Sequence, residues 1–386
     1  MKLNEICEVY SGYALKSFND EEDGFPVIKI GNILIDGTLN LDECQYTTDS
    51  VNEKYYSNKG DIYIALSGAT TGKIGIMDAD ERYVVNQRVG IVRKKSDKIP
   101  QEYIKYFLLR QTDRILQEAA GCAQPNISPK QIAEYSVPEI SKDKMFEVCS
   151  VLDKTKRIIH MRKTELTALD NLIKARFVEL FGSIYDGKFE MKTLPEIVID
   201  NKNSIKRGPF GGALKKDDFV DEGYLVYEQR HAIHNDFEYA KYYITQEKYD
   251  DMIGFKVIPG DLIISCSGVT LGRIAEIPEG AREGIINQAL LKISLNPEVM
   301  LNTFFIQQFR GDEIQEILFG FSRGSGIPNM PSMGEVKAVK FICPPLELQR
   351  QYCDFVKQVD KLKLQVQKSL DETQLLFDSL IQQYFG

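Results

Sequence analysis

Several features that mark membrane-bound, secreted or metal-binding proteins are missing from this chain of 386 residues. No apolar run approaches the roughly 20 residues that a membrane span needs, and the first residues lack the apolar core of a signal peptide. The seven cysteines are scattered and form no CxxC pair, so we expect reduced thiols, with neither a disulfide framework nor a zinc site. These absences predict a cytosolic protein without membrane association.

Motifs of common enzymes are missing as well. The turn Gly68–Lys73 has three residues between its glycines instead of four, and Ile74 stands where a P-loop has Ser or Thr, which argues against ATP binding. There is no Asn-Pro-Pro-aromatic motif of a methylase, no helicase motif and no carboxylate cluster of a nuclease. Among the three histidines, His231 and His234 have acidic neighbours but no HExxH pattern. We therefore expect no catalytic residues, no metal and no cofactor.

Composition is that of a soluble globular protein, with 43% hydrophobic and 27% charged residues. The length predicts two or three domains. The net charge of -8 is unevenly distributed, because the first 50 residues are acidic while basic residues gather later in each half. A local basic surface can bind phosphate although the whole molecule is acidic. The basic residues are Arg82, Arg88, Arg93, Lys94, Lys95, Lys202, Lys206, Arg207, Lys215 and Lys216.

The chain contains one unit twice. The stretch GDIYIALSGATTGKIG, which begins at Gly60, recurs as GDLIISCSGVTLGRIA beginning at Gly260. Asn86-Gln87 recurs as Asn287-Gln288, and other short matches keep the same order at a nearly constant offset. Short apolar runs bounded by glycine predict strands and turns in each copy. The repeat therefore predicts two homologous α+β domains.

Each copy ends in a long stretch with a helical pattern. Residues 142–180 and 348–384 contain no Gly or Pro, and their apolar residues recur at a seven-residue spacing that indicates a coiled-coil seam. At 1.5 Å per residue, such helices are roughly 50–60 Å long. The alternative is an amphipathic helix that packs on its own domain. The predicted seam residues are Leu152, Ile159, Leu166, Ile173, Leu180, Val359, Leu362, Val366, Leu376 and Leu380.

Several strings resemble those of the specificity subunits of type I restriction-modification systems. They are the Gly-Asp stretch that leads through Ser-Gly into Gly-Lys-Ile or Gly-Arg-Ile, the Asn-Gln pair after it, and the turn Gln124–Ser128. Residues Pro344–Gln349 are similar to the family's Pro-Pro-Leu-x-Glu-Gln, with the Glu displaced by one, whereas Val137–Ile140 departs further. The resemblance covers essentially the whole chain.

This resemblance implies two target-recognition domains, each binding one half of a split double-stranded DNA sequence. It also implies two long helices that pack antiparallel on each other and dock two methyltransferase subunits, which restriction subunits then join. Methylation and cleavage would belong to these partners, so the chain itself would be non-catalytic. The expected parts are a first recognition domain in 1–140, a helix in 141–182, a second domain in 183–345 and a helix in 346–386.

Candidate DNA contacts come from three patterns. Cations follow the glycine-rich turn, which suits a plain hairpin or a loop against a DNA backbone equally well. Asn and Gln can pair with adenine, but a pair repeated in both copies favours a structural role, since residues that read different bases should differ. The divergent segments Lys29–Asn32 and Glu228–His231 are better candidates for base readout. The candidates are Lys29, Asn32, Lys73, Arg88, Lys215, Gln229, Arg230, Arg273 and Arg323.

Two other functions stay open from the residues alone. One is a protein-interaction scaffold without DNA specificity, and the other is a DNA-modifying enzyme with unrecognised motifs.

Overall fold

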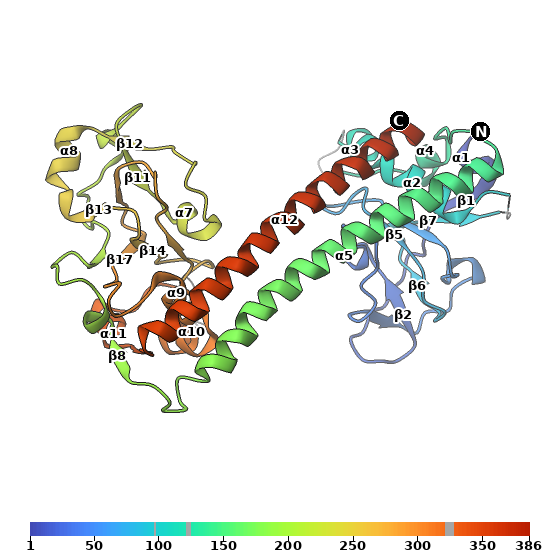
Figure 1. The fold of residues 1–386 in the computed structure, drawn as a ribbon. Helices are drawn as coiled ribbons and strands as arrows, with labels where there is room; N and C mark the ends of the chain where they lie inside the picture. Colours follow the sequence, from blue (N-terminus) through green and yellow to red (C-terminus); the bar gives the residue numbers. More distant parts are fainter. Residues whose placement is uncertain (96–97, 121–124, 321–327) are drawn as a thin grey trace. The chain divides into compact units, whose positions relative to one another are not determined.

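The computed structural model of the chain describes residues 1–95, 98–120, 125–320 and 328–386. The described residues form two compact units, Met1–Thr164 with Gln367–Gly386, and Glu165–Val366. Two long helices, α5 (Lys142–Phe181) and α12 (Leu346–Phe385), each contribute residues to both units (Figure 1). The predicted fold class, α+β with two homologous domains and two long helices, is confirmed.

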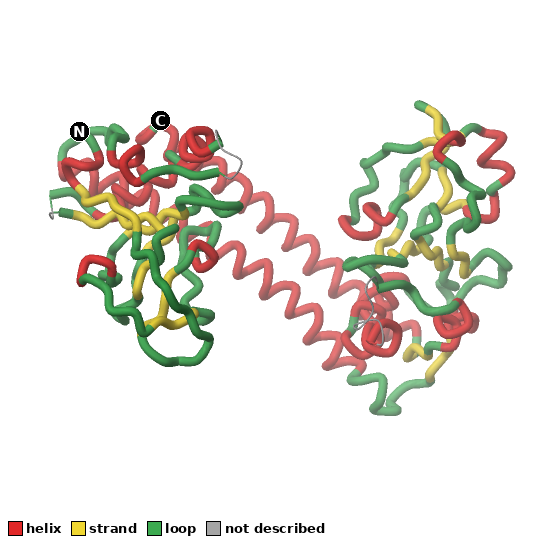
Figure 2. The backbone as a smooth tube through the Cα atoms, turned by 180° about the vertical axis from the view of Figure 1, so that it is seen from behind, coloured by secondary structure: helices red, strands yellow, loops and turns green. Residues whose placement is uncertain are grey.

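The first unit contains a four-stranded antiparallel sheet in the order β1-β7-β4-β5 and a three-stranded sheet in the order β3-β2-β6 (Figure 2, strands in yellow). Its elements before α5 are α1 (Leu3–Ile6), β1 (Cys7–Ser11), β2 (Phe25–Ile28), η1 (Ile30–Asn32), β3 (Gln45–Thr47), η2 (Glu53–Tyr55), β4 (Ile62–Ala65), β5 (Ile74–Ile76), β6 (Val84–Val85), β7 (Val89–Lys94), α2 (Gln101–Arg110), α3 (Thr112–Ala119) and α4 (Pro129–Ala133).

The central strand β4 is buried on both faces because successive side chains point to opposite sides of a sheet. Ile62 and Ile64 pack against the helical side, while Tyr63 and Ala65 pack toward the smaller sheet. This explains why β4 is a continuous apolar run and not an alternating one.

The second unit contains the same four-stranded sheet, in the equivalent order β9-β17-β14-β15. Its remaining strands form a five-stranded sheet, β10-β12-β11-β16-β13, and the pair β8-β18. Its elements between α5 and α12 are β8 (Met191–Thr193), α6 (Leu194–Ile197), β9 (Ile205–Arg207), η3 (Lys216–Asp218), β10 (Phe219–Val220), β11 (Tyr224–Tyr227), α7 (Gln229–His234), β12 (Tyr243–Ile244), α8 (Gln246–Asp251), η4 (Ile253–Phe255), β13 (Lys256–Val257), β14 (Leu262–Ser265), β15 (Ile274–Glu276), β16 (Gly284–Ile286), β17 (Leu290–Ile293), α9 (Asn302–Arg310), α10 (Asp312–Phe319), α11 (Met333–Ala338) and β18 (Lys340–Ile342).

The helices α5 and α12 run antiparallel where they meet within each unit. In the first unit, Val148 and Leu152 of α5 share a core with Ile381 and Phe385 near the end of α12. In the second unit, the ring of Phe177 lies 5.5 Å from that of Tyr352 at the start of α12. Both helix ends also pack on the body of a unit, so the two alternatives drawn from the sequence are realised together.

Most of the predicted seam residues are buried or half-buried. Leu152, Ile159, Ile173, Val359 and Val366 are buried, and Leu166, Leu180 and Leu380 are half-buried. This pattern fits the helical seam expected from the seven-residue spacing.

Leu362 and Leu376 do not belong to this buried face, because their exposed fractions are 50% and 53%. Each stands one residue before a half-buried position that makes a contact within its unit, a rotation of about 100°. Those positions are held by Lys363, whose Nζ lies 2.6 Å from Asp170 Oδ1, and by Phe377 in the first core. The prediction that Leu362 and Leu376 belong to the seam is therefore wrong, and the residues that make contacts there stand one position later.

Among the described residues, no helix combines the length and apolarity needed to cross a membrane.

Candidate functional site

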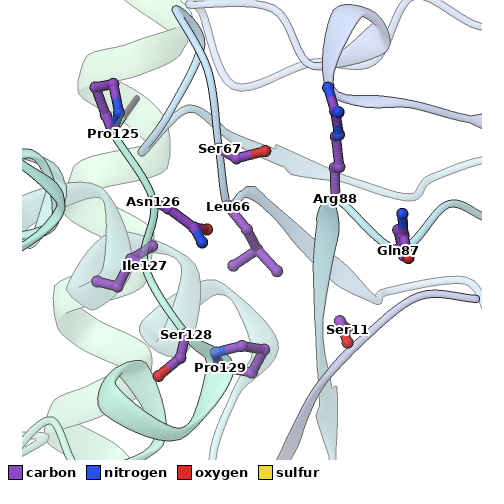
Figure 3. A pocket seen from close by; sticks show the side chains of 10 residues that line it. All are labelled: Ser11, Leu66, Ser67, Gln87, Arg88, Pro125, Asn126, Ile127, Ser128 and Pro129. Carbon is purple, nitrogen blue, oxygen red and sulfur yellow. The ribbon is translucent and has the colours of Figure 1, made fainter. Parts of the chain in front are cut away.

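A polar pocket of about 540 Å³ opens in the first unit where β4 and β1 end and β7 begins (Figure 3). Its walls come from four chain segments that are far apart in the sequence. The lining residues are Ser11, Leu66, Ser67, Gln87, Arg88, Pro125, Asn126, Ile127, Ser128 and Pro129. The repeated strings of the sequence thus converge on one place.

Backbone hydrogen bonds hold the turn around Asn126 against the end of β4. Gly68 N donates to Pro125 O at 3.1 Å, and Ile127 N donates to Leu66 O at 2.9 Å. Ser128 then caps α4, where its Oγ accepts a hydrogen bond from Gln131 N. The turn is therefore fixed, and the exposed amide of Asn126 is presented at the pocket.

The Asn86-Gln87 pair divides into one structural and one exposed residue. Asn86 Oδ1 accepts a hydrogen bond from Arg88 N at 3.2 Å, and the equivalent Asn287 Oδ1 accepts from Ala289 N at 3.0 Å. Both asparagines therefore shape the turn before the next strand, which agrees with the expected structural role. Gln87 and Gln288 are exposed, and Gln87 lines the pocket.

Arg88 supplies the only cation among the described residues that line the pocket. It is exposed, and its guanidinium has no hydrogen-bond partner within the described part of the chain. The lining residues include no carboxylate and no histidine. The pocket can therefore offer hydrogen bonds and one positive charge to a polar or anionic ligand, but not a proton-transfer pair.

The second unit brings the equivalent segments together. Ser267 pairs with Asn329 as Ser67 pairs with Asn126, and Gly268 N donates to Pro328 O at 2.9 Å. Arg207, at the end of β9, donates from Nη2 to Asn329 Oδ1 at 3.2 Å. The sequence placed Arg207 in a basic cluster but did not single it out, because only strand pairing brings it to Asn329.

The glycine-rich turns that follow β4 and β14 are hairpin connections. Thr71 Oγ1 donates to Gly68 O at 2.7 Å, and Gly72 N donates to Ala65 O at 2.9 Å. Gly68 and Gly72 both have positive φ, which explains their presence. Lys73 is half-buried and Arg273 is exposed, one residue after the turn in each copy.

Asn32 does not fit the role of a base-reading residue, because its side chain is 8% exposed. Its Oδ1 accepts from Lys29 N at 2.8 Å, and its Nδ2 donates to Asn40 O at 2.9 Å. The equivalent His231 is also buried, with Nδ1 accepting from Glu228 N at 2.9 Å. Both residues cap the same local turn, so the prediction for Asn32 is corrected to a structural role.

The remaining candidates for DNA contact differ in exposure and in the contacts that they make within the protein. Lys29 is half-buried, its Nζ bonds Gln45 and lies 3.6 Å from the centroid of the Phe18 ring, and burial lowers its pKa. Gln229 makes two hydrogen bonds with Ser267, because its Nε2 donates to Ser267 Oγ and its Oε1 accepts from Ser267 N. Arg230 lies over the ring of Tyr239 and Lys215 is exposed.

Arg323 and Gln124 lie outside the described residues. In the described part of the chain, no group of three or more His, Cys, Asp or Glu side chains is arranged to hold a metal ion.

The basic cluster expected near residue 90 is not one surface. Arg93 forms a bidentate pair with the buried Asp61, with Nε–Oδ1 and Nη2–Oδ2 distances of 2.9 and 2.6 Å. Arg82 pairs with Glu53 at 2.6 Å, and Lys95 donates to Asn4 O at 2.5 Å. Arg88 stands apart from these paired cations.

Comparisons with known proteins give a family and similar structures for this chain. A family model, the type I restriction modification DNA specificity domain, matches residues 1–168 and again 206–373. A curated relative, the type I restriction enzyme MjaVIII specificity subunit of Methanocaldococcus jannaschii, is 25% identical over 203 residues. That match covers 50% of this chain and 47% of the relative, so the chain spans about half the length of the relative it matches.

Two solved structures have the same fold over the full length of this chain. One is the S subunit of a type I restriction-modification system from M. genitalium, with a TM-score of 0.55, 17% identity and 95% of that chain covered. The other comes from work on complex assembly and conformational transition of the type I R-M system, with a TM-score of 0.62, 13% identity and 96% of that chain covered. At these identities the likeness concerns the fold.

Proposed function

Because the chain belongs to the family of type I restriction-modification DNA specificity domains, we propose that it recognises a split sequence in double-stranded DNA for a type I complex. Residues 1–140 and 183–345 would each bind one half of the target. The helices in 141–182 and 346–386 would join the two domains and dock the methyltransferase subunits, two in number, with restriction subunits joining the complex. The chain would act in the cytosol and carry no catalysis of its own.

One observation supports this proposal above the others. The two units place equivalent polar segments, Ser67 with Asn126 and Ser267 with Asn329, at the end of equivalent strands. An arginine is part of each arrangement. Two similar sites in one chain suit a ligand with two similar parts, as DNA half-sites are.

All but one of the candidate DNA contacts from the sequence are kept in the proposal. We propose Lys29, Lys73, Arg88, Lys215, Gln229, Arg230, Arg273 and Arg323 as DNA contacts, and leave out the buried Asn32. Contacts from lysine and arginine to phosphate would supply salt-dependent affinity, while side chains at base edges would supply specificity.

The test is a map of methylated bases in cells that carry the chain with its methyltransferase, compared with cells that carry the methyltransferase alone. We expect a split methylated motif that depends on the chain. Exchanging residues 1–140 for the equivalent part of a related chain should change one half of that motif only.

Three outcomes would contradict the proposal. If both halves of the motif changed, or neither did, the two domains would not be independent readers. If the purified chain alone methylated or cleaved DNA, it would be an enzyme. Association with the methyltransferase without any sequence preference on DNA would identify a protein-interaction scaffold.

A further inference from the structure

The strand register shows which residues of the two sites are equivalent. In the first unit, β7 pairs with β4 so that Gly90 faces Ile64, and Ser11 of β1 also faces Gly90. In the second unit, Leu291 faces Ile264, and Arg207 of β9 faces Leu291. Arg207 therefore occupies the position of Ser11.

The same register relates Arg88 to Ala289. Leu66 N donates to Arg88 O, and the equivalent Cys266 N donates to Ala289 O, both at 2.9 Å. The first site thus combines Ser11 with Arg88, and the second combines Arg207 with Ala289. Each site has one arginine at these two positions. In the first unit the arginine lies in the turn before β7, and in the second unit it lies on β9, the strand equivalent to β1.

Several other polar groups of the site recur in both copies. The Ser67–Asn126 and Ser267–Asn329 bridges, the turn-forming asparagines and the exposed glutamines recur at equivalent places. Groups that are common to both halves suit the part of DNA that is the same at every step, which is the sugar-phosphate backbone. A group that changes position suits the bases, which differ between half-sites.

The two guanidinium groups differ in how far the protein itself engages them, and neither is paired with a carboxylate among the described residues. Arg88 is exposed without a hydrogen-bond partner among the described residues. Arg207 is half-buried and is oriented by Asn329 and by the Phe210 ring, whose centroid lies 5.1 Å away, and its Nε is buried without a partner among the described residues. Arg310, in contrast, is engaged in the fold, since its Nη2 donates to Ile274 O at 2.8 Å.

We propose that Arg88 and Arg207 are the specificity-determining residues of their halves and that each reads a guanine. This inference rests on the proposed DNA-recognition function. The planar guanidinium has donors in a fork that match O6 and N7 of guanine in the major groove. Their positions on different walls of equivalent sites would place the guanine differently in the two half-sites.

The test uses the complex with its methyltransferase and measures binding to the methylated motif and to each single-base variant of it. Arg88→Ala should lower affinity for the motif about ten- to hundred-fold and remove the preference at one base pair of one half. Arg207→Ala should do the same in the other half. Arg82→Ala and Arg282→Ala, which replace exposed arginines elsewhere in the same units, should change neither.

Arg88→Lys separates base readout from phosphate contact, because lysine keeps the charge but loses the fork. We expect it to lose most of the guanine preference. The inference is wrong if Arg88→Ala weakens binding to all DNA sequences equally and lowers the slope of log affinity against log salt concentration by about one. That result would describe a phosphate contact. It is also wrong if neither arginine variant changes the preference while the unaltered complex binds its motif. If the unaltered complex has no sequence preference, the proposed function itself fails.

Discussion

The two units have the same four-stranded sheet order but differ in the charged side chains that pair within it. Each builds the same four-stranded order around a buried aspartate, Asp61 or Asp261, both 3% exposed. Asp61 is paired with Arg93, whereas Asp261 accepts from Ser294 Oγ at 2.5 Å and lies 3.8 Å from Lys292 Nζ. Different side-chain partners therefore retain the same backbone arrangement, so side chains can diverge while the site keeps its shape.

The largest effect is expected from the aromatic residue that closes each core. Phe385 of α12 packs on Tyr103 of the first unit at 4.9 Å, and Phe181 of α5 packs on Phe304 of the second at 4.7 Å. Replacing either by alanine should cost about 3–5 kcal/mol of unfolding free energy. Hydrogen exchange should then accelerate in residues 1–140 for Phe385→Ala and in residues 190–345 for Phe181→Ala.

Tyr185 is the control, because it is exposed and its replacement by alanine should change exchange in neither unit. Faster exchange in the second unit after Phe385→Ala would contradict the assignment of the end of α12 to the first unit.

Effects from equally large to intermediate are expected from the two buried aspartates. Asp61→Ala should cost about 3–5 kcal/mol, because it leaves the guanidinium of Arg93 without its buried partner. Asp261→Ala should cost less, about 2–3 kcal/mol, because Lys292 can release its proton when buried without a partner. Chemical denaturation followed by a signal from each unit measures both.

The two variants should also differ in their pH dependence. Burial lowers the pKa of Lys292, and Asp261 opposes that shift, so Asp261→Ala should lower this pKa further. At pH values between the pKa of Lys292 in the folded variant and its unfolded value of about 10.4, the unfolded variant binds more protons than the folded one. The stability of the variant relative to the unaltered protein therefore rises with pH in this range. The deficit of Asp261→Ala should shrink between pH 7 and 9.5, and that of Asp61→Ala should stay constant, because arginine keeps its proton. A constant deficit in both variants would mean that Lys292 stays charged.

The smallest effect is expected where the two copies are the same. Asn86→Ala and Asn287→Ala each remove one side-chain to backbone hydrogen bond and should cost about 1 kcal/mol. Gln87→Ala and Gln288→Ala should leave stability within about 0.5 kcal/mol, since both side chains are exposed. Thermal unfolding of the four variants tests this division, and a larger loss from the glutamines would reverse the assigned roles.

Local pattern was sufficient for the helices and for much of the seam. Leu152, Ile159 and Ile173 are buried as their seven-residue spacing predicts. Leu362 and Leu376 fit a stripe of the same spacing but are half-exposed, because spacing alone does not state which side of a helix meets its partner. Asn32 shows the same limit, since its burial depends on a turn that closes through Asn40.

The repeat, the two long helices and the family resemblance could be predicted from the sequence alone, which also favoured a structural role for Asn86 and Asn287. These depend on residues that are close in the chain or repeated in order. Two relations became visible only in the tertiary structure. Phe385 packs in the core of the first unit, and Arg207 occupies opposite β17 the position that Ser11 occupies opposite β7. Strand register and long-range packing set these relations, because hydrogen bonds and apolar burial join residues whose distance along the chain leaves no periodic signal.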